Sequence, residues 1–425
     1  MSLQRYADYK DSGVIWLGEV PAHWHIAPIR HLTICLDSRR IPLNSEQRAD
    51  RIGSIPYWGA NCIMGYVDEA LFDEELVLLG EDGAPFFDRT RPVAFFSIGP
   101  VWPNNHIHVL KPRESCQGKF LTYALNSTNY SEFIDGSTRD KLTQSEMNRI
   151  PIAVPSLKEQ YLITAFLDRE TAKIDALIAE QEKLIALLAE KRQATISHAV
   201  IKGLNPNAPM KDSGVAWLGE VPEHWAIYKG RQLGLLFGSG PVEEDDVQDD
   251  GVLPFIKVGS LSQDGFDIAN WNWYVKDGVA LKSKIYREFI VFPKRGAAIF
   301  LNKVNIVNCD AIIDPNLMGW KINEKFSNKY IAYLLKVRRL EELADVSTVP
   351  QINNKHIEPE KFPVPPVCEQ CEIVAFIDAE CSKIDQLREQ AECASVLLKE
   401  RRSALITAAV TGQIDVRNLT PEVPA

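Results

Sequence analysis

The sequence has little cysteine, no surplus of positive charge and no long apolar run. Its 425 residues include 8 cysteines, and 47 lysines and arginines are outnumbered by 57 aspartates and glutamates, which gives a formal net charge of −10. So few cysteines in so long a chain exclude a disulfide framework. The negative charge argues against a protein that binds nucleic acid over its whole surface, although it leaves room for a local basic groove.

Signals for membrane insertion or export are missing as well. No apolar stretch reaches the roughly 20 residues that a membrane-spanning helix needs. The N-terminal stretch MSLQRYADYKDSG lacks the apolar core of a secretion signal, so we expect a cytoplasmic protein. An apolar content of 45% and a charged content of 24% are ordinary for a globular protein, and the length is enough for two or three domains.

The chain repeats itself. Residues 10–24 (KDSGVIWLGEVPAHW) and 211–225 (KDSGVAWLGEVPEHW) are identical at thirteen of fifteen positions. Residues 159–200 align without gaps on residues 369–410, with twenty of forty-two positions identical. The chain is therefore a tandem duplication of a short signature, a variable body and a long helical tail. Two such copies predict approximate two-fold symmetry, which suits one task performed at two places.

The repeat predicts an α+β fold: two mixed α/β bodies separated by two long antiparallel coiled-coil helices, with a pseudo-two-fold internal repeat. The expected segments are a first body over 1–155, a long helix over 156–205, a second body over 206–365, a second long helix over 366–413 and a C-terminal tail over 414–425. Between their shared edges the bodies differ in sequence. Such divergence on a common frame is what two readers of different targets would need.

Local patterns predict elements inside the bodies. Short apolar runs indicate strands and mixed segments indicate short helices. The expected strands are 76–79, 93–98, 289–292 and 297–301, and the expected helices are 119–125 and 328–335. Ser156 stands three residues before Glu159, which predicts a capping box at the start of the first long helix. Gly203 and Gly412 are the expected C-terminal stops of the two long helices.

Apolar residues in both long helices follow a 4-3 spacing, which is typical of a coiled-coil seam. Acidic Glu170 and Glu380 and basic Lys191 and Arg401 fall in the same frame at matching places. Antiparallel pairing would bring each glutamate to a base. The predicted seam residues are Ile163, Leu167, Ile174, Leu177, Leu184, Leu188, Ile373, Ile377, Ile384, Leu387, Leu398 and Leu405.

Catalytic motifs are absent from the sequence. It contains no GxxxxGK[ST] phosphate loop, no GxGxxG dinucleotide turn, and neither HExxH nor GxSxG. It also lacks an Asn-Pro-Pro-aromatic motif for amino-group methylation and a Pro-Asp…Glu-x-Lys set for a nuclease metal. His23 and His224 recur beside tryptophans of the signature, and this favours packing over a ligand role. We therefore expect no catalytic residues and no metal site in this chain.

Cysteines near the C-terminus allow one alternative to that expectation. Cys368 and Cys371 form a CxxC pair that is followed by Cys381 and Cys393, a spacing compatible with zinc. The equivalent positions of the first repeat hold lysine, tyrosine, threonine and lysine. A metal required by the architecture would occur in both repeats, so reduced thiols are the preferred interpretation.

Polar, basic and aromatic residues gather at the expected edges of the bodies. Arginine, lysine, asparagine and glutamine pair with base edges in the major groove, and hydroxyls suit phosphates, although ordinary solvated turns explain any single residue equally well. The candidate DNA-binding residues are Tyr57, Asn61, Asn104, Asn105, His106, Thr138, Arg139 and Lys141 in the first body, and Lys257, Lys294, Arg295, Asn302, Lys303, Thr348, Gln351, Asn353 and Lys355 in the second.

With these features the chain resembles the specificity subunits of type I restriction-modification systems. The resemblance covers nearly the whole chain. It rests on the doubled signature, on proline shortly before the Glu-Gln pair of each long helix, on F[LI]D followed by KID, and on the closing segments KRQATISHAV and RRSALITAAV.

The resemblance implies that each body is a target recognition domain that reads one half of a bipartite double-stranded DNA site. The helices would set the gap between the halves and dock two modification subunits, which methylate an adenine in each half with S-adenosylmethionine. Two restriction subunits would add translocation and cleavage with ATP and Mg. The chain itself would bind no cofactor and catalyse nothing. The alternatives are a coiled-coil adaptor that binds proteins at both ends and a nuclease with an unrecognised site.

Overall fold

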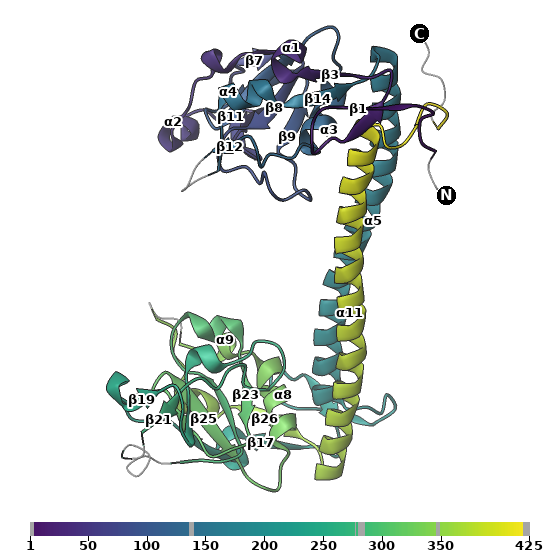
Figure 1. Cartoon of the computed structure of the whole chain (residues 1–425). Coiled ribbons are helices and arrows are strands. Elements are labelled where there is room, and N and C mark those ends of the chain that lie inside the picture. The colour runs from purple at the N-terminus through teal and green to yellow at the C-terminus, as the bar shows by residue number, and fades with distance from the viewer. Residues whose placement is uncertain (1–3, 136–139, 277, 279–284, 346–348, 420–425) are drawn as a thin grey trace. The chain divides into compact units, whose positions relative to one another are not determined.

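The chain divides into two compact units (Figure 1). Unit 1 comprises Met1–Leu184 and Gln390–Ala425, and unit 2 comprises Ile185–Glu389. Each unit therefore combines one body with a part of each long helix. Within the described part of the chain, no helix is both long and apolar enough to cross a membrane. The computed structural model describes residues 4–135, 140–276, 278, 285–345 and 349–419.

The body of unit 1 contains two four-stranded sheets, with strand orders β4-β11-β8-β9 and β6-β5-β10-β7. Only the pair β5 and β10 is parallel within these two sheets. The strands are β4 (Thr33–Cys35), β5 (Ile55–Trp58), β6 (Ile63–Val67), β7 (Phe72–Asp73), β8 (Leu76–Gly80), β9 (Ala94–Ser97), β10 (Pro100–Pro103) and β11 (Ile107–Pro112). Strand β8 reads LVLLG and is buried throughout, because it lies between β9 and β11.

Smaller elements of unit 1 complete this body. Three two-stranded pairs are formed by β1 with β2, β3 with β14 and β12 with β13. These strands are β1 (Tyr9–Asp11), β2 (Glu19–Pro21), β3 (His25–Pro28), β12 (Ile134–Asp135), β13 (Lys141–Leu142) and β14 (Pro151–Val154). The short helices are α1 (Ile29–Leu32), η1 (Asp37–Arg39), α2 (Ser45–Ala49), α3 (Gly118–Asn126) and α4 (Gln144–Arg149).

The body of unit 2 repeats this plan, with sheet orders β18-β25-β22-β23 and β19-β21-β20-β24 and a parallel pair of β20 and β24. Its sheet strands are β18 (Gly234–Phe237), β19 (Val247–Gln248), β20 (Leu253–Ile256), β21 (Tyr274–Val275), β22 (Phe289–Pro293), β23 (Asn305–Val307), β24 (Ile312–Ile313) and β25 (Leu317–Ile322). The remaining strands are β15 (Met210–Asp212), β16 (Glu220–Pro222), β17 (Ala226–Lys229) and β26 (Lys361–Val364). The short helices are α6 (Gly230–Leu233), η2 (Glu244–Asp246), η3 (Val258–Ser260), η4 (Ala297–Leu301), α8 (Asn328–Arg338), α9 (Leu340–Leu343) and α10 (Asn354–Ile357).

Most local predictions for the bodies are confirmed. The expected strands at 76–79, 93–98 and 289–292 correspond to β8, β9 and β22, and both expected short helices correspond to α3 and α8. The predicted strand at 297–301 is wrong, because that segment forms the 3-10 helix η4. Gly296 before it and Asn302 after it have φ of 81° and 48°, and these positive angles turn the chain at both ends.

The repeated signature fastens each body to its long helix. In unit 1 the fully buried Trp24 donates its indole N–H to Oε1 of Glu159 at 3.2 Å, and Tyr6 donates its hydroxyl to the same oxygen at 2.7 Å. Nε2 of His23 lies 3.0 Å from the other carboxylate oxygen. The recurring His-Trp pair therefore packs around a buried carboxylate, as the sequence predicted for the histidine.

Unit 2 repeats this joint with its own residues. Trp225 donates its indole N–H to Oε1 of Glu369 at 3.0 Å, and Nε2 of His224 lies 2.8 Å from Oε2. The tryptophan is again buried. A signature of identical spacing thus produces the same contact in both units, which explains why the repeat keeps these residues together.

A second joint lies nine residues, about two and a half turns, farther along each long helix. Asp168 accepts hydrogen bonds from the Nζ of Lys119 and the hydroxyl of Tyr123, both at 2.8 Å. In unit 2 the matching carboxylate, Asp378, accepts from Lys329 at 2.6 Å and from Tyr333 at 2.7 Å. These contacts fix α3 against α5 and α8 against α11.

The long helices are α5 (Leu157–Lys202) and α11 (Val367–Val410). Ser156 Oγ accepts the N–H of Glu159 at 3.4 Å, which is half of the predicted capping box. The glutamate does not complete the box, because its carboxylate holds the signature residues instead. Gly203 and Gly412 follow the two helix ends with φ of 74°, as expected of C-terminal stops.

The helices are paired antiparallel within each unit, as predicted. In unit 1, Arg402 in the last third of α11 donates to Asp175 in the first half of α5, with 2.7 Å between Nε and Oδ1. In unit 2, Arg192 in the last third of α5 lies 3.4 Å from Asp385 in the first half of α11. Each arginine and each aspartate is displaced by the repeat length from its counterpart, so the two ion pairs are copies of one contact.

The buried seam of the long helices agrees with the predicted one at some positions and is shifted by one residue at the positions between them. Ile163, Leu167, Ile174, Leu188, Ile373, Ile377 and Ile384 are buried, and Leu398 and Leu405 are half-buried. Leu177, Leu184 and Leu387 are 51%, 42% and 51% exposed, so their placement in the seam was wrong. The neighbouring residues take their place, because the spacing after Leu167 is four residues, to buried Thr171, instead of three.

This shift also removes the glutamates from the seam. Glu170 and Glu380 pair with lysines of their own helices, Lys173 at 2.8 Å and Lys383 at 2.7 Å. The predicted contacts of these glutamates across the seam were therefore replaced by the aspartate–arginine pairs. Antiparallel pairing was correct, but the residues that carry its charge complementarity are different ones.

Candidate nucleic-acid interface

Two loops of unit 1 meet because they leave parallel strands. In the pairing of β5 with β10, Trp102 lies opposite Tyr57 and Pro103 opposite Trp58. The carboxyl ends of parallel neighbours share one edge, so the turn after Trp58 and the loop after Pro103 are adjacent. The N–H of Asn104 confirms this by donating to the carbonyl of Trp58 at 3.0 Å.

Three further backbone hydrogen bonds add two more segments to this edge. The N–H of Glu81, directly after β8, donates to His106 O at 2.9 Å, and the N–H of Leu142 donates to Glu81 O at 2.7 Å. The N–H of Gly83 donates to Asp140 O at 3.2 Å. We call this edge of unit 1, formed by residues 59–61, 81–83, 104–106 and 140–142, the strand-end edge.

The candidate residues of the first body fall into two groups. Asn61, Asn105, His106 and Lys141 lie on the strand-end edge and are exposed or half-buried. Tyr57 and Asn104 are buried and satisfied inside the protein: the Tyr57 hydroxyl accepts the N–H of Leu43 at 3.1 Å, and Asn104 Oδ1 accepts the N–H of His106 at 2.8 Å. Their assignment to direct contact with DNA does not fit these positions, because neither side chain is free at the surface.

Unit 2 forms the same edge with the same bonds. The N–H of Lys294 donates to Asn316 O at 2.9 Å, the N–H of Ile352 donates to Lys294 O at 2.9 Å, and the N–H of Gly296 donates to Pro350 O at 3.0 Å. Lys294 thus corresponds to Glu81 of unit 1. The strand-end edge of unit 2 is formed by residues 257, 294–296, 314–316 and 350–352.

Isolated bridges mark the equivalent centre of each edge. In unit 1, Asp82 pairs with Lys141, and in unit 2, Arg295 pairs with Gln351. The backbone arrangement is therefore shared, whereas the side chains that it presents differ in charge and hydrogen-bonding capacity. Identical geometry with different donors and acceptors is the arrangement that two base specificities require.

The other candidates of the second body have mixed positions. Lys257 directly follows β20, and its Nζ lies over the rings of Phe255 and Trp273. Lys355 is exposed and forms an ion pair with Asp345 at 3.0 Å, and Asn353 is exposed beside it. Thr138, Arg139 and Thr348 lie outside the described residues.

Asn302 and Lys303 are engaged in internal contacts. Asn302 donates to Lys336 O at 2.8 Å and accepts the N–H of Leu340 at 3.0 Å. Lys303 donates to Leu261 O at 2.8 Å. Both residues tie η4 to its surroundings, so a role in holding the fold explains them better than contact with DNA.

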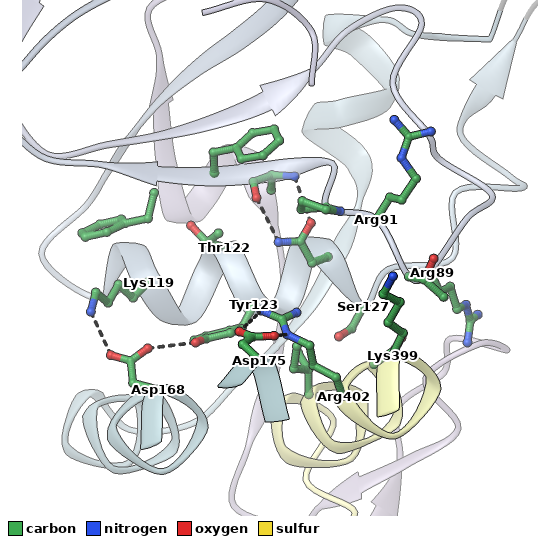
Figure 2. A pocket seen from close by; sticks show the side chains of 18 of the residues that line it. Arg89, Arg91, Lys119, Thr122, Tyr123, Ser127, Asp168, Asp175, Lys399 and Arg402 are labelled. Carbon is green, nitrogen blue, oxygen red and sulfur yellow. Dashed lines mark hydrogen bonds and ion pairs between the residues drawn. The ribbon is translucent and has the colours of Figure 1, made fainter. Parts of the chain in front are cut away.

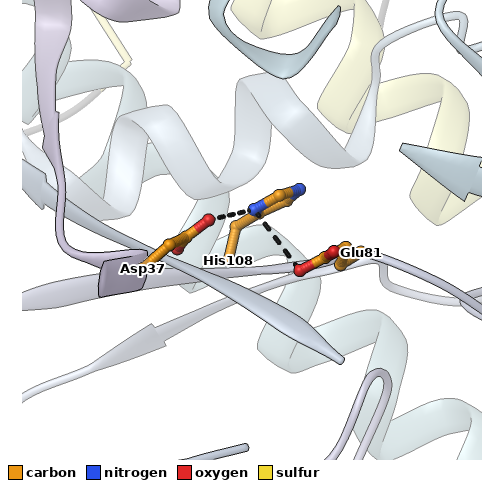
Figure 3. A group of neighbouring side chains, drawn as sticks. All are labelled: Asp37, Glu81 and His108. Atoms are coloured by element: carbon orange, nitrogen blue, oxygen red, sulfur yellow. Dashed lines mark hydrogen bonds and ion pairs between the residues drawn. The ribbon is translucent and has the colours of Figure 1, made fainter. Parts of the chain in front are cut away.

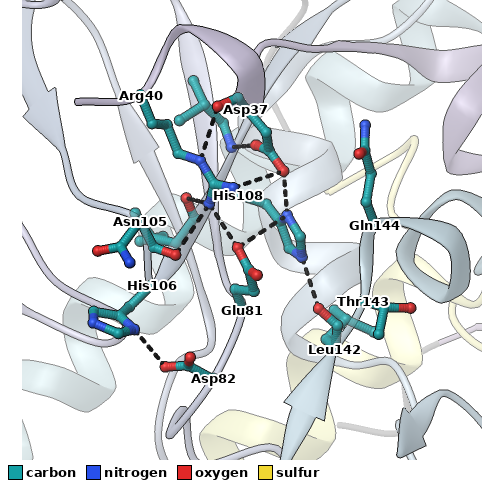
Figure 4. A network of polar contacts seen from close by, with 12 residues as sticks. Asp37, Arg40, Glu81, Asp82, Asn105, His106, His108, Leu142, Thr143 and Gln144 are labelled. Carbon is teal, nitrogen blue, oxygen red and sulfur yellow. Dashed lines mark hydrogen bonds and ion pairs between the residues drawn. The ribbon is translucent and has the colours of Figure 1, made fainter. Parts of the chain in front are cut away.

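A polar network behind the edge of unit 1 was not predicted from the sequence (Figures 3 and 4). His108 is 1% exposed, and its Nδ1 lies 2.5 Å from Asp37 Oδ2 while its Nε2 lies 2.9 Å from Leu142 O. Arg40 Nη1 donates to Glu81 Oε2 at 2.6 Å and to Ile107 O at 2.9 Å. The network therefore ties together three segments that carry the strand-end edge.

The network balances its own charges. Burial raises the pKa of Asp37, but the hydrogen bond from His108, the Val109 amide and the Arg40 guanidinium outweigh burial and hold that pKa below its usual value. Ligand atoms of Asp37, Glu81 and His108 lie within 4.8 Å of one another, a spacing that a metal ion could bridge. Because Arg40 already neutralises the carboxylates, the arrangement fits a closed ion-pair network better than a metal centre.

The comparison with known families agrees with this geometry. A family model described as the type I restriction modification DNA specificity domain matches residues 33–186 and 222–392. The chain belongs to this family. Its two matched segments fall on the two repeats, so each contains the strand-end edge of one body.

Full-length relatives support the family assignment. The type I restriction enzyme EcoDI specificity subunit of Escherichia coli is 21% identical over 93% of this chain and 90% of its own length. A protein of Haemophilus influenzae assigned to the same kind of subunit is 26% identical over 83% of this chain and 86% of its own length. Specificity subunits are non-catalytic, and the assignment favours this function over that of a coiled-coil adaptor.

Solved structures share the fold. A chain from a structure of the type I R-M system superposes with a TM-score of 0.69 at 14% identity, covering 92% of this chain and 98% of that one. The HsdS subunit from Thermoanaerobacter tengcongensis gives a TM-score of 0.53 at 14% identity, with 93% and 98% covered. The predicted fold class, with two mixed bodies and long helices, is thus confirmed.

Proposed function

We propose that each strand-end edge of this specificity subunit reads one half of a bipartite DNA site. The observation that carries the proposal is the matched bridge, Asp82 with Lys141 in unit 1 and Arg295 with Gln351 in unit 2. Arginine, lysine and glutamine can bond base edges in the major groove, and carboxylates can accept from cytosine. The same scaffold with different side chains would give each unit its own preference.

The chemistry would come from partner subunits. The family resemblance supports two modification subunits that use S-adenosylmethionine and two restriction subunits that use ATP and Mg, acting on DNA in the cytoplasm. In this chain the polar cluster of unit 1 is tied up in internal hydrogen bonds and ion pairs. Its contribution would be to select the DNA site and to position the partners on it.

Substitutions at the matched bridges test this division of labour. Replacing Lys141 by alanine is expected to weaken discrimination in one half-site by about 1–3 kcal/mol for each lost base contact and to leave the other half unchanged. Gln351→Ala is the matched variant, because it removes the equivalent side chain of unit 2. Methylome sequencing of cells that carry each variant with intact partner subunits would show which half of the motif becomes degenerate.

The pattern across the two variants decides the outcome. Degeneracy of opposite halves supports separate reading by the two units. Equal damage to both halves by either variant, or an unchanged motif in both, would refute the assignment of the edges. Western blots of the complex from the same cells exclude a simple loss of protein.

We further propose that the paired helices set the gap between the half-sites. Seven residues added to each helix keep its 4-3 spacing and extend it by about 10 Å, so the methylated motif should gain about three base pairs in its gap. The insertions belong between the Asp175–Arg402 and Arg192–Asp385 pairs, which keeps both contacts. The same seven residues added to the exposed turn at 249–250, between β19 and β20, should leave the gap unchanged. An unaltered gap in a methylating variant with longer helices contradicts this proposal.

A further inference from the structure

A groove of about 500 Å³ lies in unit 1 between the body and the paired helices (Figure 2). The loop after β8 contributes Arg89 and Arg91, α3 contributes Lys119 and Tyr123, and α11 contributes Lys399 and Arg402. Helix α5 contributes Asp168 and Asp175, so a loop and three helices of one unit bound the groove.

The lining of this groove is basic although the chain is acidic. Five cationic side chains, those of the arginines and lysines just named, face two carboxylates, Asp168 and Asp175. The carboxylates are already engaged, by Lys119 at 2.8 Å and by Arg402 at 2.7 Å. Arg89 and Arg91 are exposed, and no ion pair is found for either within the described residues. The third cation without a partner in the lining, Lys399, lies 3.6 Å from Glu182 outside it. The exposed guanidinium groups of Arg89 and Arg91, the latter beside Asp88, therefore carry the remaining positive charge of the groove.

The floor of the groove continues toward the strand-end edge. Trp58 lines the groove and packs against Phe95 in a tilted ring contact with 4.8 Å between centroids. Trp58 is also the last residue of β5, directly before the turn that contains Asn61. A ligand that reaches from the edge into the groove would therefore pass over one continuous surface of unit 1.

In unit 2, side chains of the same unit cover the tyrosine that corresponds to Tyr123 of the groove. Tyr333, the counterpart of Tyr123, is covered by Phe266 with 4.6 Å between ring centroids in an edge-to-face contact. Lys336 donates to Gly265 O at 2.6 Å beside it, and burial lowers the pKa of this lysine to about 8. The segment around Phe266 thus occupies the place that is open in unit 1.

We infer that this groove binds the phosphodiester backbone of the DNA beside the half-site that unit 1 reads. The inference rests on the proposed function. Unpaired guanidinium groups are suited to phosphate oxygens, which they bind bidentately, and such contacts fix the register of DNA without reading its sequence. Continuity with the strand-end edge favours DNA over an acidic protein segment, because the same duplex would cover both surfaces.

The salt dependence of binding tests the inference. The double variant Arg89→Ala with Arg91→Ala, purified with its modification subunits, is titrated with a duplex that carries the mapped site and with a scrambled duplex. Each lost phosphate contact lowers the slope of log K against log salt by about 0.9, so the slope should fall by about 2. The ratio of the wild-type binding constant to that of the variant should therefore fall about tenfold between 50 and 200 mM salt, on both duplexes.

A matched control removes two other exposed cations of unit 1, Arg30 and Lys158, which do not line the groove. This variant should retain the wild-type slope. An unchanged slope in the groove variant, with wild-type protein still selecting its site, overturns the groove inference and leaves the proposed function intact. Altered base preference, or loss of the modification subunits from the complex, also overturns it, because the groove would then read bases or bind protein. Wild-type protein that ignores the mapped site overturns both proposals.

Discussion

Replacing Trp24 by alanine is expected to lower the free energy of unfolding of unit 1 by about 3–5 kcal/mol. The indole is fully buried and packs edge-to-face on Tyr6, with 5.8 Å between ring centroids. Its removal leaves a cavity at the point where the body meets α5, and it takes one donor from the buried carboxylate of Glu159. Urea unfolding followed by far-ultraviolet circular dichroism would show the loss as an earlier first transition.

Two further variants test whether the loss of stability comes from this contact between body and helix or from general damage to the fold. His23→Ala removes the neighbouring signature residue, whose side chain is 48% exposed, and should cost no more than about 1 kcal/mol because exposed ion pairs contribute little. Trp225→Ala should produce a similar loss in unit 2, because Trp225 makes the same bond to Glu369. Limited proteolysis would identify the unit that opens. Equal losses from His23→Ala and Trp24→Ala would contradict the proposed basis of the joint.

The joint shows how far a repeated motif can be interpreted without coordinates. Recurrence of His23 and Trp24 before a body correctly indicated packing. The Glu-Gln pair that opens each helix was equally visible as a recurring feature. What the sequence did not show is that Glu159 receives the indole, because the two residues are separated by 135 positions and only the folded chain brings them together.

The candidate DNA-binding residues were expected at the edges of the bodies, and the structure separates them into two groups. Lys141, Arg295 and Gln351 lie on the matched bridges of the strand-end edges. Tyr57 and Asn104 had the right chemistry but are buried, since hydrogen bonds inside the loops consume their polar atoms. Composition cannot distinguish a polar residue that supports a loop from one that projects from it.

The polar network of unit 1 had no signal in the sequence. Asp37 and His108 are 71 positions apart, and Arg40 reaches Glu81 over 41 positions. Ionisable residues are common on the surface of a chain with 24% charged residues. Only the crossing of η1 and the ends of β8 and β11 concentrates these four side chains in one place. Clusters of this kind depend on tertiary contacts and lie beyond pattern-based inference.

The seam of the long helices was predicted with the correct period and an incorrect choice at every second position. The error began at residues 170 and 171, where the predicted frame placed Glu170 and the structure buries Thr171 instead. Its hydroxyl donates to Leu167 O at 2.7 Å within the helix, so burial leaves no unsatisfied donor. Beyond that point both frames contain apolar residues, because residues such as Leu177 and Ile178 are adjacent and both apolar. Hydrophobic spacing alone therefore does not distinguish the two frames.

This adjacency provides the sharpest test of the frame. Ile178 is 9% exposed and Leu177 is 51% exposed. Ile178→Ala is expected to lower the free energy of unfolding of unit 1 by about 2–5 kcal/mol, as for other buried large-to-small substitutions. Leu177→Ala removes a similar number of atoms from a solvated face and should change stability by about 0.5 kcal/mol or less. Both values come from urea titrations of the full chain, with the slope of the transition compared between variants.

The comparison is informative because the two substitutions change helix propensity by nearly the same amount. Alanine is the best helix former, so each variant gains a few tenths of a kcal/mol in the helix itself. Any larger difference therefore reports packing between α5 and its neighbours. If Leu177→Ala lowered the free energy of unfolding as much as Ile178→Ala or more, the predicted frame, with Leu177 in the seam, would be the correct one. It would also contradict the pairing of Asp175 with Arg402, since that ion pair lies across the same face of α5.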